Sequence, residues 1–258
     1  MEQIEIEDRG PVRIVRLHRP DKLNAWTPRM HAELFAAITA GNDDGSVGAF
    51  VVTGSGRGFC AGADIGEVFA ARAEGAVDAD GRRADEARGD WVALIRSSKP
   101  VVAAINGAAI GVGLTLTLPM DFLVAAPEAK LSVRFVKMGL VPELASSHFL
   151  VQRCGWGRAS DLSLSGRTVL GDEALQIGLV DEIADDVVAA AIERAQTYAT
   201  NAPPSLRLTK RLLTQNSSET DLALVQRREI EALHEAYETS EHREAIAAFA
   251  EKREPSFR

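Results

Sequence analysis

Two stretches of this chain share one layout, and that layout limits the folds available to it. In residues 49–65 a short apolar run, rich in β-branched side chains, is interrupted by three glycines at alternate positions and by a fourth at Gly62. In residues 101–118 a similar run reaches an Asn-Gly turn and then a loop with Gly111 and Gly113. Each stretch predicts a buried strand, a glycine-rich loop and the start of a helix.

The remaining sequence predicts more strands and helices. Residues 12–18 are expected to form a strand, and Thr27 before Pro28 is typical of a helix start, with a loop over residues 41–48. Further strands are expected at 121–126, 130–133 and 179–183, and helices at 144–153, 158–165, 185–200, 205–213, 219–239 and 242–252. Residues 201–204 are the expected linker. Strands interleaved with helices, then helices alone, favour an α/β core with a parallel sheet and an appended α-helical region.

The two glycine-rich loops predict a chemical site. Each loop leaves backbone N–H groups without partners where a helix starts. Two such groups aimed at one carbonyl oxygen form an oxyanion hole, which stabilises negative charge on that oxygen. The glycines could also serve only close packing between loop and helix, but two such stretches in this order favour the site. A dinucleotide fingerprint that starts at Gly54 is excluded, because it would need glycine where Phe59 stands.

The same motifs resemble a known family. Residues 59–65 (FCAGADI) and 106–113 (NGAAIGVG) resemble the crotonase (enoyl-CoA hydratase/isomerase) superfamily. Shorter matches lie at residues 19–20, 23–25, 138–142, 178–181 and 251–253 and at Phe257, so the resemblance covers nearly the whole chain. It implies a crotonase-like spiral of ββα turns over residues 1–200. Residues 201–258 would be a helical region that covers the pocket and builds a homotrimer or a dimer of trimers.

The resemblance also implies the substrate and how it is held. The substrate would be an acyl-CoA thioester whose carbonyl accepts hydrogen bonds from the backbone N–H groups of Ala63 and Val112. Other expected substrate contacts are the residues around these donors and one lysine: Ala61, Gly62, Asp64, Ile65, Gly111 and Lys22. Lys210 and Lys252 are further candidates for the CoA phosphates, although a solvated lysine is an equally ordinary interpretation. Asp64 can instead cap the following helix. Residues 67–89 would shape the acyl pocket.

The acid–base groups depart from the hydratase pattern of this family. Hydratases of the family use two glutamates, and the matching positions here carry Thr115 and Phe135. Glu143 remains, in a Pro-Glu sequence followed by small residues and two serines, which resembles Δ3,Δ2-enoyl-CoA isomerases with a single glutamate base. The apolar residues around it predict a partly desolvated carboxyl. The alternative is a carboxylate in the first turn of a helix, where the helix dipole favours negative charge without any catalytic role.

Two other functions stay open at this point. One is an enoyl-CoA hydratase that uses a different carboxylate, such as Asp64 or Glu67. The other is a non-catalytic acyl-CoA-binding protein that keeps the oxyanion hole, which Thr115 and Phe135 would fit and Glu143 would leave unexplained. Turnover of a 3-enoyl-CoA, turnover of a 2-enoyl-CoA, or tight binding without turnover separates the three.

Composition excludes several classes. A formal net charge of −8 argues against nucleic acid as the main partner. Two cysteines give no disulfide framework and fit a reducing cytoplasm, and no signal peptide or membrane-spanning run is evident. The five histidines show no metal-ligand spacing, so we expect no metal. No cofactor is expected either, since CoA is part of the substrate. Cys60 is expected to be a small buried residue, and Asp121 and Ser132 are expected to be structural.

Overall fold

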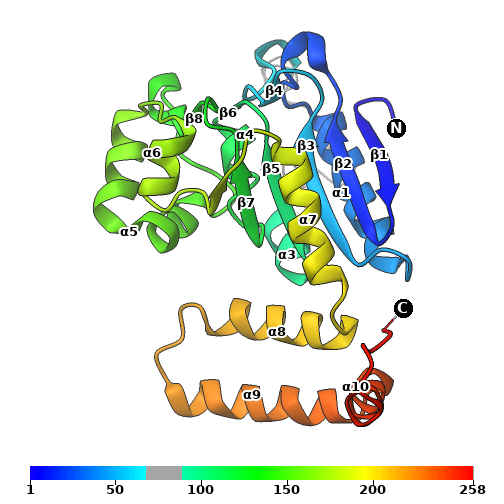
Figure 1. The fold of residues 1–258 in the computed structure, drawn as a ribbon. Helices are drawn as coiled ribbons and strands as arrows, with labels where there is room; N and C mark the ends of the chain where they lie inside the picture. Colours follow the sequence, from blue (N-terminus) through cyan, green and yellow to red (C-terminus); the bar gives the residue numbers. More distant parts are fainter. Residues whose placement is uncertain (68–88, 258) are drawn as a thin grey trace, which may run out of the picture.

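A large parallel sheet forms the centre of the molecule. The computed structural model describes residues 1–67 and 89–257 (Figure 1). The sheet has the strand order β1 (Ile4–Arg9), β2 (Val12–Leu17), β3 (Ala49–Gly54), β5 (Val101–Ile105), β7 (Phe122–Ala125) and β9 (Glu182–Ile183). Only the β1–β2 pair is antiparallel. The predicted parallel sheet is confirmed, although β1 was not predicted and β9 is shorter than residues 179–183.

A second, smaller sheet lies partly where the sequence predicted glycine-rich loops, and its third strand falls within the strand predicted at 130–133. It contains β4 (Gly58–Cys60), β6 (Ala108–Ile110) and β8 (Leu131–Ser132), paired in parallel in that order. Strands of two or three residues are too short to show an apolar alternation, so sequence periodicity cannot detect them. β3, β5 and β7 in the large sheet are each followed along the chain by one strand of the small sheet. This repetition is the expected spiral of ββα turns.

Helices cover both faces of the large sheet. α1 (Pro28–Asp43) and α3 (Trp91–Ser97) pack on one face, and α7 (Val187–Ala199) packs on the other, mainly against β3 and β5 (Figure 1). Thr27 caps α1 as predicted, because its side chain accepts a hydrogen bond from Met30 N at 3.0 Å. The predicted loop at 41–48 was wrong at its start: α1 continues to Asp43, and Gly41 packs directly against the Phe50 ring.

The middle of the chain forms short helices at one end of the sheet. These are α4 (Val112–Thr115), the 3-10 turn η3 (Arg134–Met138), α5 (Ser146–Ser165) and α6 (Gly171–Gln176). The two helices predicted at 144–153 and 158–165 are joined in α5 across a kink at Gly155, whose φ of 74° is left-handed. The predicted acyl-pocket segment, residues 67–89, lies outside the described residues except at its two ends.

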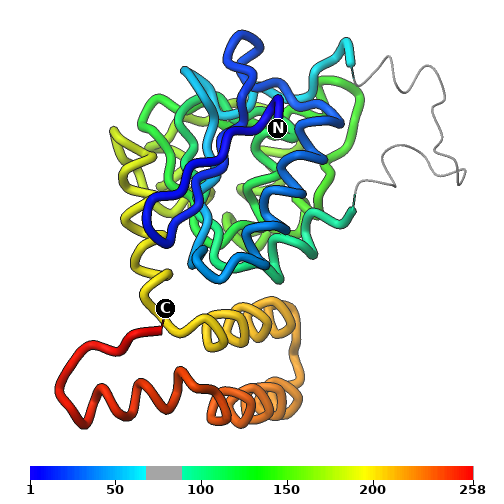
Figure 2. The backbone as a smooth tube through the Cα atoms, turned by 90° about the vertical axis from the view of Figure 1, so that its right-hand side faces the viewer, coloured from blue at the N-terminus to red at the C-terminus, as the bar shows by residue number. Residues whose placement is uncertain are grey.

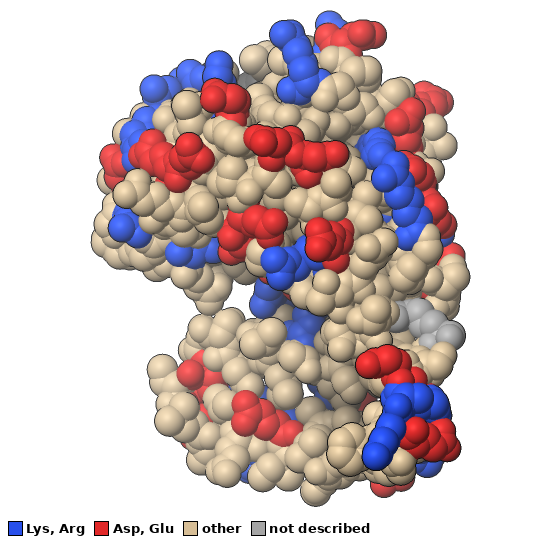
Figure 3. All heavy atoms as spheres, in the orientation of Figure 1, with Lys and Arg blue, Asp and Glu red and all other residues tan. Residues whose placement is uncertain are grey.

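The C-terminal helices α8 (Pro203–Asn216), α9 (Leu222–Tyr237) and α10 (Ser240–Glu251) lie below the sheet body (Figures 1 and 2). The predicted linker at 201–204 was wrong, because Pro203 and Pro204 occupy the first turn of α8, where a missing N–H costs nothing. Figure 3 shows a hollow between the body and these helices, with Lys and Arg side chains visible inside it. The division of the chain at residue 200 stays a prediction.

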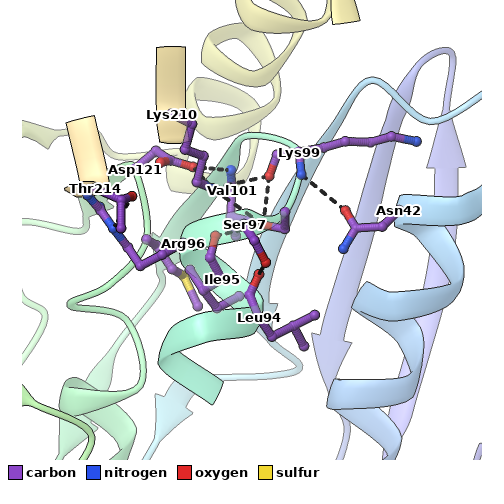
Figure 4. A network of polar contacts seen from close by, with 12 residues as sticks. Asn42, Leu94, Ile95, Arg96, Ser97, Lys99, Val101, Asp121, Lys210 and Thr214 are labelled. Atoms are coloured by element: carbon purple, nitrogen blue, oxygen red, sulfur yellow. Dashed lines mark hydrogen bonds and ion pairs between the residues drawn. The ribbon is translucent and has the colours of Figure 1, made fainter. Parts of the chain in front are cut away.

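One buried ion pair ties α8 to the body (Figure 4). Lys210 Nζ lies 2.6 Å from Asp121 Oδ2, and the same carboxylate oxygen accepts Val101 N at 2.7 Å. Burial lowers the pKa of Lys210, and the attraction of Asp121 acts in the opposite direction. The structural role expected of Asp121 is therefore confirmed. The suggestion that Lys210 contacts a CoA phosphate was wrong, since this ammonium is buried and paired inside the protein.

Candidate active site

The two glycine-rich loops lie next to each other because the strands that precede them are paired. β4 and β6 are parallel neighbours, with Cys60 opposite Ala109. The predicted donors Ala63 and Val112 each lie three residues beyond these partners. The two loops therefore begin side by side at the ends of paired strands. Gly113 packs against the Cys60 backbone, with no room for a Cβ atom. A Cβ at Gly62, whose φ is 106°, would lie only 3.2 Å from Ile110 O.

The backbone around Ala63 determines where its N–H points. Trp26 forms a parallel bridge with Ala63: Trp26 N donates to Gly62 O at 2.8 Å, and Asp64 N donates to Trp26 O at 2.9 Å. In a parallel bridge of this kind the partner strand bonds to the residues before and after the bridged residue, so the N–H and C=O groups of Ala63 itself point away from Trp26. The Ala63 N–H therefore faces away from Trp26, and within the described residues no acceptor is found for it.

Val112 offers a second N–H at the start of α4. Gly111 precedes the helix with φ 56° and ψ −121°, a conformation that glycine adopts without strain. Gly111 N donates to Ser132 O at 2.8 Å, and Gly111 O accepts from Leu114 N and Thr115 N, so the loop is anchored from both sides. The first N–H groups of a helix have no partner inside it. For the Val112 N–H, the described part of the chain provides no acceptor.

The two positions where family hydratases carry glutamates border this second loop. Thr115 lies one turn after Val112, is fully buried and turns its hydroxyl toward Val112 O at 3.5 Å. Phe135 is buried, and its ring lies 4.0 Å from the place of a Cβ at Gly111. Neither side chain can take up a proton as a base near neutral pH. Two-glutamate hydration therefore has no carboxylate at either of these positions.

Glu143 lies in the turn before α5. The helix begins at Ser146, so the interpretation of Glu143 as a residue of the first helical turn was wrong. Its carbonyl oxygen accepts Ser146 N at 3.1 Å, and between them Leu144 and Ala145 have φ values of 58° and 53°. The desolvation expected from apolar neighbours is not found within this chain, because Glu143 is exposed and Val141 is 80% exposed.

Asp64 and Glu67 are held by one arginine. Arg19 Nη1 lies 3.0 Å from Asp64 Oδ2, and Arg19 Nη2 lies 3.1 Å from Glu67 Oε1. Asp64 Oδ1 accepts Glu67 N at 3.3 Å, which confirms the capping role expected for this residue. Partial burial opposes ionisation of Asp64, but the hydrogen bonds from Arg19 and from the Glu67 N–H outweigh it and lower the pKa of Asp64.

The remaining predicted contacts surround the first loop. Lys22 is exposed at the end of the 3-10 turn η1 (Pro20–Lys22), and Ile65 is 60% exposed. Ala61 N donates to Leu23 O at 3.0 Å, which brings the Lys22 turn beside this loop but leaves the Ala61 N–H unavailable to a ligand. Cys60 is buried, and burial raises the pKa of its thiol to about 12, so it is a neutral packing residue as predicted.

Two residues were missed by sequence reasoning, Arg19 and Asn24, and the state of a third, Ser146, was not foreseen. Arg19 bridges the carboxylates described above. Asn24 is fully buried with a left-handed φ of 55°, and its side chain contacts three backbone groups. Ser146 carries a buried hydroxyl with no hydrogen-bond partner in the described structure. Arg19 and Asn24 stand within family-like motifs, and that was the available signal. Ser146 was considered only as a residue that could line the pocket or orient Glu143, and nothing in the sequence indicates that its hydroxyl is buried.

No group of three His, Cys, Asp or Glu side chains that could hold a metal ion occurs in residues 1–67 and 89–257. None of the described helices has the length and apolar character needed to cross a membrane.

Comparisons with known proteins agree with this geometry. The family model for enoyl-CoA hydratase/isomerase matches residues 7–258. A probable enoyl-CoA hydratase (echA8) of Mycobacterium tuberculosis is 35% identical over 264 residues, covering 99% of this chain and 98% of the relative. The 1,2-epoxyphenylacetyl-CoA isomerase of Escherichia coli is 33% identical over 252 residues, covering 95% and 94%.

Solved structures give the same result. The crystal structure of an enoyl-CoA hydratase from Polaromonas sp. JS666 superposes with a TM-score of 0.87 at 30% identity and covers 99% of both chains. The likeness therefore includes the C-terminal helices as well as the sheet body. The chain belongs to the enoyl-CoA hydratase/isomerase family of the crotonase superfamily and has the crotonase fold.

Proposed function

We propose that this enzyme is a Δ3,Δ2-enoyl-CoA isomerase with Glu143 as its single base. The observation that carries the proposal is which of the candidate positions carry a carboxylate. Thr115 and Phe135 fill the two positions beside the second loop, whereas Glu143 stands in a left-handed turn outside any helix. One carboxylate is sufficient for isomerisation, since the same group can remove a proton and return it.

The proposed mechanism uses the two backbone donors and Glu143 together. The thioester oxygen accepts hydrogen bonds from the Ala63 and Val112 N–H groups, which makes the C2 proton more acidic. The Glu143 carboxylate takes that proton, the C3–C4 double bond shifts to C2–C3 through a dienolate, and the carboxylic acid returns the proton at C4. Fixed donors of this kind are typically worth about 100- to 1,000-fold in turnover each.

The rest of the substrate would lie mainly along the first loop. We assign its contacts to Ala61, Gly62, Asp64, Ile65 and Lys22, together with Gly111 of the second loop, and place Lys22 near a CoA phosphate. Because the N–H of Ala61 is already used, its contact would involve the carbonyl or the methyl group. No cofactor beyond the CoA of the substrate enters this scheme.

The assembly is proposed from the family resemblance, and a cytoplasmic location is proposed from the two free cysteines, which fit a reducing compartment. Large apolar side chains are exposed on α9 and α10, such as Leu222 (76% exposed) and Phe249 (87% exposed). Exposed apolar surface of this kind is typical of protein interfaces. This supports an interface between subunits on these helices, which in our proposal builds a homotrimer or a dimer of trimers.

Hydration is the second candidate, and the names of relatives favour it, since most are called enoyl-CoA hydratases. It would need another carboxylate as base. Asp64 and Glu67 are both ion-paired with Arg19, and the lowered pKa of Asp64 makes that carboxylate a weaker base. The hypothesis of a non-catalytic acyl-CoA-binding protein does not explain why the chain carries a glutamate at position 143.

A paired absorbance assay separates the candidates. One reaction contains a 3-enoyl-CoA and the other a 2-enoyl-CoA, and the absorbance of the conjugated thioester is followed in both. The isomerase predicts a rise with the 3-enoyl substrate that Glu143→Gln abolishes. Glu128→Gln, a change at an exposed carboxylate 15 positions earlier in the chain, should leave that rise intact. A fall with the 2-enoyl substrate would identify a hydratase. Tight binding without either change would identify a binding protein.

A further inference from the structure

Arg19 joins two segments of the chain, residues 19–25 and residues 64–67, at the first oxyanion loop. Its Nη1 atom donates to Ala25 O at 2.8 Å and to Asp64 Oδ2 at 3.0 Å, and its Nη2 atom donates to Glu67 Oε1 at 3.1 Å. Only 16% of the Arg19 side chain is exposed, and 19% of the Asp64 side chain. Charge-assisted hydrogen bonds with this limited exposure are stronger than those of surface pairs.

Asn24 fixes the same turn from its other side. Asn24 Oδ1 accepts Arg19 N at 2.8 Å, and Asn24 Nδ2 donates to Ser55 O at 2.9 Å and Gly58 O at 2.8 Å. The turn over residues 19–25 is therefore held to the connection between β3 and β4. Because the amide is completely buried, losing any of these bonds would leave a polar group unsatisfied.

Ala63 lies between the two points that Arg19 holds. On one side, Arg19 binds the Ala25 carbonyl, next to Trp26, whose N–H and C=O pair with Gly62 and Asp64. On the other side, Arg19 binds the side chain of Asp64, the residue that follows Ala63. A single guanidinium thus restrains both backbone segments of the Trp26–Ala63 bridge.

We infer that Arg19 is a positioning residue that sets the direction of the Ala63 N–H toward the thioester oxygen. The inference rests on the proposed function, in which Ala63 is an oxyanion donor. Arg19 itself does not touch the reacting atoms in this account. Oxyanion donors act only when they are held at hydrogen-bond distance from the developing charge, and a displacement of about 1 Å can cost about 100-fold in rate.

The experiment measures carbonyl polarisation separately from turnover. The probe is 2,4-hexadienoyl-CoA, whose absorbance shifts to longer wavelength when its thioester oxygen is polarised. It is bound to the full-length protein in a Glu143→Gln background, with Arg19 intact or changed to Met or Lys. Asp64→Asn removes the negative charge that pairs with Arg19 and keeps a side-chain oxygen that can still accept the Glu67 N–H. Arg9→Met is the matched control, because Arg9 pairs with Glu7 at an exposed edge of the sheet.

We expect a red shift with Arg19 intact that Arg19→Met reduces by more than half, with Arg19→Lys intermediate and Arg9→Met unchanged. In proteins that keep Glu143, Arg19→Met should lower kcat about 10- to 100-fold while KM stays within about 3-fold. If Arg19→Met does not fold, Arg19→Lys and Asp64→Asn decide by the same spectral shift.

Two results would contradict the inference, and they are distinguishable. A red shift that is the same in all folded variants would show that Arg19 has no positioning role while the oxyanion hole stands. The absence of any red shift with Arg19 intact would contradict the oxyanion hole itself, and with it both the proposed function and the role of Arg19.

Discussion

Two left-handed residues separate the candidate base from the helix that follows it. Leu144 and Ala145 carry side chains at φ values of 58° and 53°, where an L-residue costs about 1–2 kcal/mol relative to the right-handed region. Strain of this kind persists where the surrounding structure requires it, and it concentrates at functional sites. Here it turns the chain between Glu143 and α5, so that the carboxyl stands outside the helix.

Ser146, directly after this turn, leads to a prediction about stability. Its hydroxyl is buried without a partner, and a buried unsatisfied donor typically costs about 1–3 kcal/mol. Ser146→Ala should therefore increase the free energy of unfolding by about 1 kcal/mol, because it removes that group and alanine is the better helix former. Thermal melting should show a rise of about 2–4 °C.

The neighbouring Ser147 is exposed and provides the control, since Ser147→Ala removes a solvated hydroxyl and should change the melting temperature very little. A lower melting temperature for Ser146→Ala than for Ser147→Ala would mean that the Ser146 hydroxyl is satisfied in solution, for example by an ordered water.

Sequence reasoning at this scale succeeded where the signal is local. Thr27 could be predicted as a cap because its partner, Met30, is only three residues away. The glycines could be predicted as loop residues because their residue type alone indicates a turn or a close backbone approach. Arg19 and Asn24 could not be interpreted in the same way. Their partners, such as Asp64 and Gly58, lie 34 to 45 positions further along the chain, so only the folded structure brings them together.

At the scale of elements, the paired strands β4 and β6 explain why the two loops meet. Long helices and most strands of the large sheet were predictable, because their apolar patterns extend over enough residues, although β1 was missed. β8 lies within the strand predicted at 130–133, whereas β4 and β6 were missed, since their three residues carry no periodicity. The proline pair at the start of α8 was misinterpreted as a linker, although proline is as acceptable in the first turn of a helix as in a loop.

The attachment of α8 to the body leads to a second prediction about stability. Lys210→Met removes one partner of a buried ion pair and leaves the Asp121 carboxylate with only the Val101 N–H. Breaking such pairs typically costs about 3–5 kcal/mol, and the partial exposure of Asp121 places the expected loss near the lower value, about 3 kcal/mol. Denaturant unfolding of the full chain measures it.

Arg211→Met is the matched control for this change. Arg211 follows Lys210 on α8 and pairs with Glu235 at the surface, and an exposed ion pair contributes little to the free energy of unfolding. Equal losses for the two variants would show that the Lys210–Asp121 pair is not a special link between α8 and the sheet. A loss confined to Lys210→Met supports that link.

At the scale of the whole molecule, the proposed site combines parts that are far apart in the chain. The donor loops come from the first and second ββα turns, and Glu143 comes from the connection to α5. Family membership and fold could be predicted from the sequence motifs at residues 59–65 and 106–113, which form the two neighbouring glycine-rich loops. The choice among reactions could not, since it depends on which carboxylate reaches the bound thioester.

Hydrogen exchange at C4 tests the central claim most directly. A trans-2-enoyl-CoA is incubated with the protein in D2O, and the recovered thioester is analysed by NMR. Our account predicts deuterium at C4. In the reverse isomerisation Glu143 removes a C4 proton, the exposed carboxyl exchanges that proton with D2O, and the forward reaction then returns deuterium to C4. The account predicts no exchange with Glu143→Gln. A C4 position that stays fully protonated while a 3-hydroxyacyl-CoA accumulates would contradict the account and identify a hydratase.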